Sequence, residues 1–172
     1  MVILKKQIAG ASAAALTRFV ASARKAAKLR GNVTVLITSN LEMRKLNHRF
    51  RKKDEATDVL SFPTDANPYD SSAGDLAISA DIARENAKKL GHPVSQEIKV
   101  LILHGILHLA GYDHEIDSGE MARVEQRLRK KLRLPVSLIQ RSEAISKGDN
   151  RSNPRMKTLR KAKRLEQRSK RR

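Results

Sequence analysis

Apolar residues recur with two different periods over the first 135 positions, and these periods divide the chain into predicted helices and strands. Apolar positions three or four residues apart are typical of an amphipathic helix, whereas alternation or a short β-branched run is typical of a strand. Five segments have helical spacing and are bounded by capping or stop residues. The first covers residues 11–29, and the second is a short helix that begins at Ser39 or Asn40 and has Met43, Leu46 and Phe50 on its apolar face. The third runs from Ser79 to Gly91, and the fourth from Pro93 or Ser95 to Gly111. The fifth begins at a capping box of Asp117 and Glu120 and ends just before Pro135.

Strand signals lie between these helices. Residues 33–38, 57–63 and 74–79 carry them, and the opening VILKKQI is a further candidate. Strands and helices in this order predict an α+β fold, a small mixed β-sheet packed by about five helices. We expect residues 1–140 to form this single domain.

The segment from Ile98 to Ala110 is apolar at almost every position. A helix that is hydrophobic on all sides is buried, so this segment predicts the central helix of the fold. Gly111 is placed to end it in a left-handed conformation. Three of the five histidines of the chain nevertheless fall in or just after this helix, in the stretch HGILHLAGYDH at 104–114.

The spacing of these histidines predicts a metal site. His104 and His108 are four residues apart, which places both imidazoles on one face of a helix. The turn at Gly111 can bring His114 to the same ion. Three nitrogen ligands leave one tetrahedral position for water, as in catalytic sites, and no thiolate is available because the chain has no cysteine. We expect one Zn²⁺ held by these three histidines plus a water whose pKa falls to about 7, although nickel or other first-row metals could load the same site in vitro.

The histidine spacing predicts a metal-dependent hydrolase, and two alternatives remain open. The pattern H-x-x-x-H-x-x-G-x-x-H is also that of the metzincin proteases, in which a glutamate after the first histidine is the general base. Gly105 occupies that position here, so a metalloprotease-like hydrolase lacks its expected base. The second alternative is a non-catalytic protein whose metal is structural.

Charge points to a polyanionic partner. The chain has 36 basic and 18 acidic residues, a formal net charge of +18. Residues 141–172 contain 13 basic and 3 acidic residues, and residues 1–140 are also basic. Nucleic acid is the natural partner for such a surface, although solubility or an anionic membrane surface would also explain it. Few apolar residues follow position 145, and we expect 141–172 to be a basic tail that is disordered or becomes helical on RNA.

The location expected from the sequence is cytoplasmic. Absence of cysteine fits a reducing compartment. The apolar stretch in the opening MVILKKQIAG is too short for the hydrophobic region of a signal peptide. No other stretch approaches the roughly 20 apolar residues that span a bilayer. The sequence indicates no oligomeric state.

Three ordered blocks resemble the YbeY family of bacterial endoribonucleases. They are HGILHLAGYDH at 104–114, NHRFRKKDEATDVLSFP at 47–63 and GDLAIS at 74–79, within a similarity over roughly residues 33–133. The resemblance implies that His104, His108 and His114 bind zinc, and that Arg51 faces the cleft as a catalytic residue together with His114. Asp58 departs mildly, because that position is often asparagine in the family block.

The family resemblance also implies an activity and partners. It implies a metal-dependent, single-strand-specific endoribonuclease that acts on rRNA, including the 3′ end of 16S rRNA, and in ribosome quality control. The implied partners are ribosomal particles, a small-subunit ribosomal protein and the GTPase Era. With these partners, the non-catalytic alternative is a ribosome-assembly factor with a structural metal. Asp113 could orient a ligand histidine or simply form the turn, and Thr57 and Ser61 could contact RNA or only fill strand positions.

Overall fold

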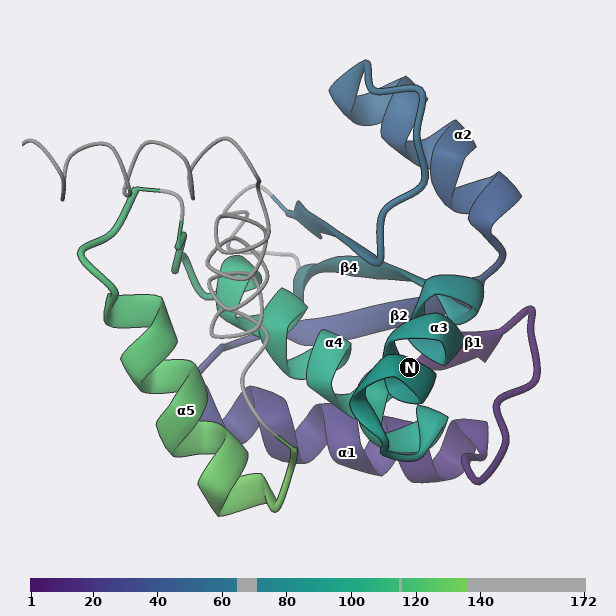
Figure 1. Cartoon of the computed structure of the whole chain (residues 1–172). Coiled ribbons are helices and arrows are strands. Elements are labelled where there is room, and N and C mark those ends of the chain that lie inside the picture. The colour runs from purple at the N-terminus through teal and green to yellow at the C-terminus, as the bar shows by residue number, and fades with distance from the viewer. Residues whose placement is uncertain (65–70, 115, 136–172) are drawn as a thin grey trace, which may run out of the picture. The chain divides into compact units, whose positions relative to one another are not determined.

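The computed structural model describes residues 1–64, 71–114 and 116–135. Four strands and five helices occur in this part of the chain, and Figure 1 shows their arrangement. The α+β fold expected from the sequence is confirmed. The elements are β1 (Val2–Leu4), α1 (Ala13–Ala26), β2 (Asn32–Thr38), α2 (Asn40–Arg51), β3 (Val59–Pro63), β4 (Ser72–Ser79), α3 (Ala80–Leu90), α4 (Val94–Leu109) and α5 (Glu120–Leu132).

The four described strands form one mixed sheet in the order β1-β2-β4-β3. The β1, β2 and β4 strands are parallel, whereas β3 runs antiparallel to β4 and forms an edge of the sheet. Alternate residues of each strand face opposite sides. On one side of the sheet, Val33, Val35 and Ile37 of β2 are buried. On the opposite side, Leu60 and Ala77 belong to a second small core with Met43 of α2.

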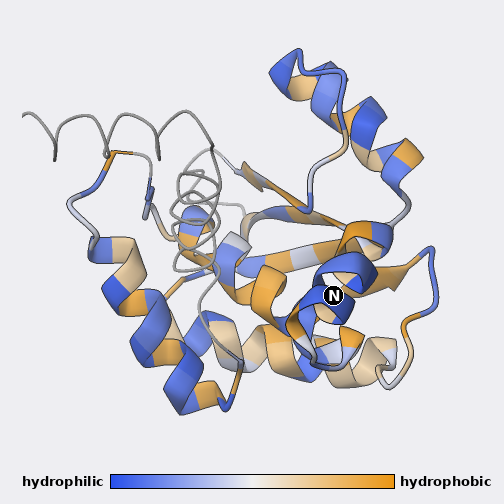
Figure 2. Ribbon diagram, viewed as in Figure 1, coloured by the Kyte–Doolittle hydropathy of each residue, from blue (hydrophilic) through white to orange (hydrophobic). Residues whose placement is uncertain are grey.

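Helix α4 lies at the centre of the fold, as its sequence predicts. It contacts β3 and β4 as well as α1, α3 and α5, and every residue from Ile98 to Leu107 except Lys99 is buried. Figure 2 shows α4 as orange over much of its length, whereas α2 and α5 carry much more blue. Burial on all sides fixes the rotation of α4 and therefore the directions of its polar side chains.

The predicted capping box of the last helix is wrong in its register. Gly119 is the N-cap of α5, and Glu120 is the first helical residue rather than the third. Asp117 nevertheless caps the start of the helix, because its carboxylate accepts hydrogen bonds from the backbone N–H groups of Gly119, Glu120 and Met121. These bonds lower the pKa of Asp117, against the opposing effect of burial.

The other boundaries differ from the predictions by a few residues. The α1 helix ends before the expected position 29, because Lys28 already adopts a left-handed conformation with φ of 58°. Ser39 and Ser79 are the N-caps of α2 and α3, as expected. The predicted basic tail at 141–172 lies outside the described residues, so its boundary stays a prediction. None of the described helices combines the length and the apolar character needed to cross a bilayer.

Candidate metal centre

Two of the three expected ligands come from α4. His104 is buried and His108 is half-buried, one helical turn further along. The Nε2 atoms of the two imidazoles lie 3.2 Å apart. Nitrogen atoms bound to one tetrahedral zinc at its usual bond length lie about 3.3 Å apart. The pair therefore has the spacing of two ligands of a single ion.

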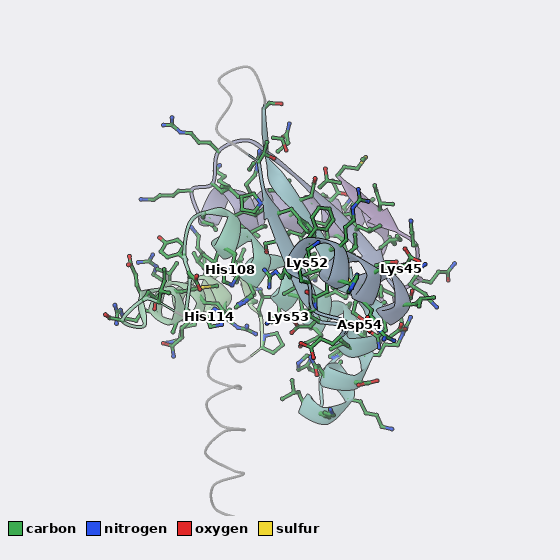
Figure 3. The ribbon with its side chains drawn as sticks, turned by 90° about the horizontal axis from the view of Figure 1, so that it is seen from above. Lys45, Lys52, Lys53, Asp54, His108 and His114 are labelled. Atoms are coloured by element: carbon green, nitrogen blue, oxygen red, sulfur yellow. The ribbon has the colours of Figure 1, made fainter. Side chains whose placement is uncertain are left out.

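The turn after α4 supplies the third imidazole. Gly111 has φ of +87°, a conformation that costs glycine little, and the N–H of Tyr112 donates back to the carbonyl oxygen of Leu107. This reversal brings the His114 ring to 5.3 Å from both other rings, measured between centroids. The ligand nitrogens of all three histidines lie within 4.8 Å of one another. Figure 3 shows His108 and His114 next to each other at this end of α4.

The donor set fits a first-row metal ion such as zinc. Neutral imidazole nitrogens are suitable ligands for Zn²⁺, and the Nε2 atoms of His104 and His108 lie 3.2 Å apart. The pKa of His108 is lowered to about 4, first by burial and then because His104, His114 and Arg51 disfavour a positive charge beside them, against the opposing effect of Asp113. His108 is therefore neutral near pH 7, which leaves a nitrogen lone pair free to bind a metal.

A buried carboxylate on α5 contacts His104 on the side of the ring away from the other two histidines. His104 Nδ1 lies 3.3 Å from Glu125 Oε2, and Glu125 is fully buried. An Nδ1–H that donates to this carboxylate leaves the lone pair of Nε2 directed towards the other histidines. The Glu125–His104 contact thus sets the tautomer that a metal ligand needs.

Arg129 completes this arrangement one turn further along α5. Its guanidinium donates to Glu125 Oε1 at 2.7 Å and to the carbonyl oxygen of Pro135 at 2.6 Å. Burial raises the pKa of Glu125, but hydrogen bonds and charge from His104 and Arg129 outweigh it and lower the pKa to about 2. Glu125 is therefore ionised at neutral pH and accepts from both neighbours.

An open pocket of about 330 Å³ lies over the histidines. Arg51, the last residue of α2, lines it together with all three histidines, although Arg51 and His104 are far apart in sequence. The structure thus brings the expected basic residue to the expected metal site. The other lining residues are Thr57, Asp58, Val59, Ser61 and Asp113.

Asp113 and Asp58, to which the sequence assigned no definite role, both line the pocket. Asp113 lines the pocket, and its backbone carbonyl accepts from the N–H of Asp117, so it also forms the turn. Asp58 accepts from its neighbours, the Thr57 hydroxyl and the Val59 N–H. Sequence reasoning missed Glu125 and Arg129, because a Glu and an Arg four residues apart on a charged helix ordinarily form a surface pair.

Close packing of α4 against the sheet favours glycine at position 105. A Cβ added there would lie 2.7 Å from Leu76 Cδ2 and 3.3 Å from Ser61 Oγ. Helix α4 therefore approaches β3 and β4 so closely that a larger side chain at 105 must displace its neighbours. The position that carries the general base in metzincin proteases here faces the sheet, where even a Cβ atom would crowd Leu76.

Fold and site together define a class: an α+β protein with an open cluster of three histidines that could hold a metal ion, the ligand arrangement of metal-dependent hydrolases. A family model described as "Endoribonuclease YbeY" matches residues 3–133. The chain belongs to this endoribonuclease family, and the resemblance recognised from the three motifs is confirmed.

Individual relatives agree with this assignment. The chain is 57% identical to an Endoribonuclease YbeY of Koribacter versatilis, an alignment that covers 86% of this chain and 95% of the relative. It is 54% identical to the one of Solibacter usitatus, over 63% of this chain and 71% of the relative. The solution structure of TM1509 from Thermotoga maritima is similar with a TM-score of 0.50 and 28% identity, covering 77% of this chain and 92% of that one.

Proposed function

We propose that this protein is a zinc-dependent, single-strand-specific endoribonuclease of rRNA processing. The observation that carries the proposal is the convergence of His104, His108 and His114 with Arg51 on one open pocket. The family assignment supports ribonuclease chemistry, and the net charge of +18 supports a polyanionic substrate.

The protein's own residues would divide the work of hydrolysis. When bound, a zinc ion supplies a Lewis acid and lowers the pKa of water at its open position. His104, which contacts Glu125, would hold that ion together with His108 and His114. The guanidinium of Arg51 can offer two parallel N–H groups to the phosphate oxygens, on which negative charge increases in the transition state.

The substrate and partners follow from the family resemblance. We propose rRNA, including the 3′ end of 16S rRNA, as the substrate, with a further role in ribosome quality control in the cytoplasm. A small-subunit ribosomal protein and the GTPase Era are the proposed partners. The polar, open pocket supports an extended substrate, since a single RNA strand can enter it from the surface.

Replacing His114 by alanine tests the proposal. His114 is exposed, so His114→Ala should remain folded but lose most of its bound zinc and more than about 100-fold of its cleavage rate on single-stranded RNA. His48→Ala is the matched control, because His48 is exposed on α2 and does not line the pocket. Metal content, circular dichroism and cleavage of a labelled RNA are measured on the same preparations, with chelation and zinc restoration as controls for contaminating nuclease.

The same preparations separate the two alternatives. A folded His114→Ala protein that cleaves RNA like the wild type would make the metal structural and the nuclease proposal wrong. Hydrolysis of casein or a peptide by the zinc-loaded wild type would favour the protease. The crowded, buried position of Gly105 counts against that outcome.

A further inference from the structure

A second pocket lies on the face of the sheet opposite α4. Thr34, Asp75 and Phe62 stand side by side on β2, β4 and β3, because the strand register pairs Asp75 with both other residues. Leu46 and Phe50 of α2 also line this pocket, which has a volume of about 480 Å³. We call it the α2 groove; Leu36, Leu76 and Ala77 complete its lining.

Two aromatic rings are exposed or partly exposed in the α2 groove. Phe50 is 56% exposed, although the helical pattern predicts it on the apolar face of α2. Its ring meets that of Phe62 edge to face, with centroids 4.9 Å apart, and the guanidinium of Arg49 lies 5.4 Å from the Phe50 centroid. An exposed aromatic beside a cation is the usual platform on which single-stranded nucleic acids stack their bases.

The α2 groove is adjacent to the pocket lined by Arg51 and the three histidines, which we call the metal pocket. Phe50 lines the groove, and the next residue, Arg51, lines the metal pocket. On the edge strand β3, Ser61 likewise lines the metal pocket and Phe62 lines the groove, because successive strand residues face opposite sides of a sheet. A single strand bound at the histidines therefore needs to pass only one edge strand to reach the groove.

The charges around the C-terminal end of α2 suit a nucleic acid backbone. Arg44 and Lys45 form ion pairs with Asp54 and Glu42, whereas Arg49, Lys52 and Lys53 have no carboxylate partner within the described residues. In the view of Figure 3, Lys52 and Lys53 lie between the labelled histidines and Lys45. These cations can contact phosphates between the metal pocket and the groove.

From these observations we infer that the α2 groove binds an unpaired nucleobase of the single-stranded RNA whose backbone lies at the metal centre. The inference rests on the proposed function. Phe50 and Phe62 stack on the base, and Arg49 and Lys52 contact the flanking phosphates. The Asp75 carboxylate at the groove accepts hydrogen bonds from base N–H groups, whereas it would repel a phosphate.

The test combines a side-chain deletion with a base deletion. Binding of the full-length protein to a labelled single-stranded RNA of about 12 nucleotides is measured by fluorescence anisotropy, with chelator present so that the RNA stays intact. Phe50→Ala should weaken binding about tenfold, and Phe50→Trp should preserve it. Leu41→Ala, which removes a 62% exposed side chain of the same helix outside the groove, should leave the affinity unchanged.

Abasic substitution along the RNA then identifies the bound base. At one position, loss of the base should weaken binding to the wild type about tenfold but have little further effect on Phe50→Ala, because the two changes remove one contact. Phe62→Leu, which keeps an apolar side chain but removes the ring, should show the same dependence. Unchanged affinity in both variants, or additive losses at every abasic position, would show that no base occupies the groove.

The outcome also separates this inference from the proposed function. A wild-type protein that neither binds nor cleaves single-stranded RNA contradicts the proposed function. A wild type that binds and cleaves RNA, with Phe50→Ala and Phe62→Leu equal to it, contradicts only the α2 groove. Loss of a protein partner in these variants at unchanged RNA affinity would assign the groove to protein docking and overturn the inference.

Discussion

Glu125 determines which nitrogen of His104 is available to a metal. A neutral imidazole has one N–H and one lone pair, and an ionised carboxylate 3.3 Å from Nδ1 retains the proton on that side. Arg129 keeps Glu125 charged and in place, since it bonds the second carboxylate oxygen at 2.7 Å. One residue from a neighbouring helix thus leaves the Nε2 lone pair of His104 available to a metal ion, whereas without Glu125 either ring nitrogen could carry the proton.

Replacing Glu125 by glutamine should weaken zinc binding about 10- to 100-fold, the usual cost of losing the hydrogen-bond partner of a ligand histidine. Zinc affinity is measured by competition with a chelating dye, and the tautomer of His104 by nitrogen NMR of the metal-free protein. Because the change leaves the buried charge of Arg129 without its carboxylate, the double variant Glu125→Gln/Arg129→Met serves as a second version without that charge. Glu120→Gln, on the exposed first turn of α5, is the control, and equal zinc affinities for all four proteins would contradict this role.

At the scale of elements, the sequence predicts those helices, strands and side-chain directions that depend on local periodicity. The apolar run from Ile98, the stop at Gly111 and the four-residue spacing of His104 and His108 together predict α4 and two ligand directions. Contacts between distant segments leave no such pattern. The spacing does not indicate that Arg51 reaches the histidines or that α5 turns Glu125 inwards, and Phe50 is exposed despite its place on the apolar face of α2.

The close packing of α4 on the sheet gives a prediction about stability. Gly105→Ala should destabilise the protein by about 1–3 kcal/mol, because the added methyl group lies 2.7 Å from Leu76 Cδ2. Helix propensity alone has the opposite sign, since alanine exceeds glycine by about 1 kcal/mol. Urea denaturation therefore decides between packing and propensity.

A double-mutant cycle with Leu76 sharpens that measurement. Leu76→Val shortens the side chain that the new methyl group meets, so Gly105→Ala should cost less in that background. A stabilising effect of Gly105→Ala, or the same cost in the wild-type and the Leu76→Val backgrounds, would show that α4 does not depend on this close approach.

At the scale of the whole molecule, positive charge is spread over two regions of the chain. Residues 1–140 contain 23 basic and 15 acidic residues, and residues 141–172 contain 13 and 3. The first region holds the pocket lined by the three histidines and Arg51, where the proposed function needs phosphate contacts of defined geometry. The second region has the higher density of cations, which suits sequence-independent binding of a polyanion through release of its counterions.

Deleting residues 146–172 should therefore weaken RNA binding and reduce its dependence on salt, while zinc content stays unchanged. Each phosphate contact to single-stranded RNA contributes about 0.7 to the slope of log K against log salt, so the loss of even three contacts lowers the slope by about 2. The slope is measured by titrating labelled RNA at several salt concentrations. Lys88→Gln/Lys89→Gln, which removes two exposed cations from the end of α3, controls for a general effect of charge and should change the slope little. An unaltered slope in the deletion variant would assign RNA binding to residues 1–145 alone, with the basic end of the chain serving another purpose.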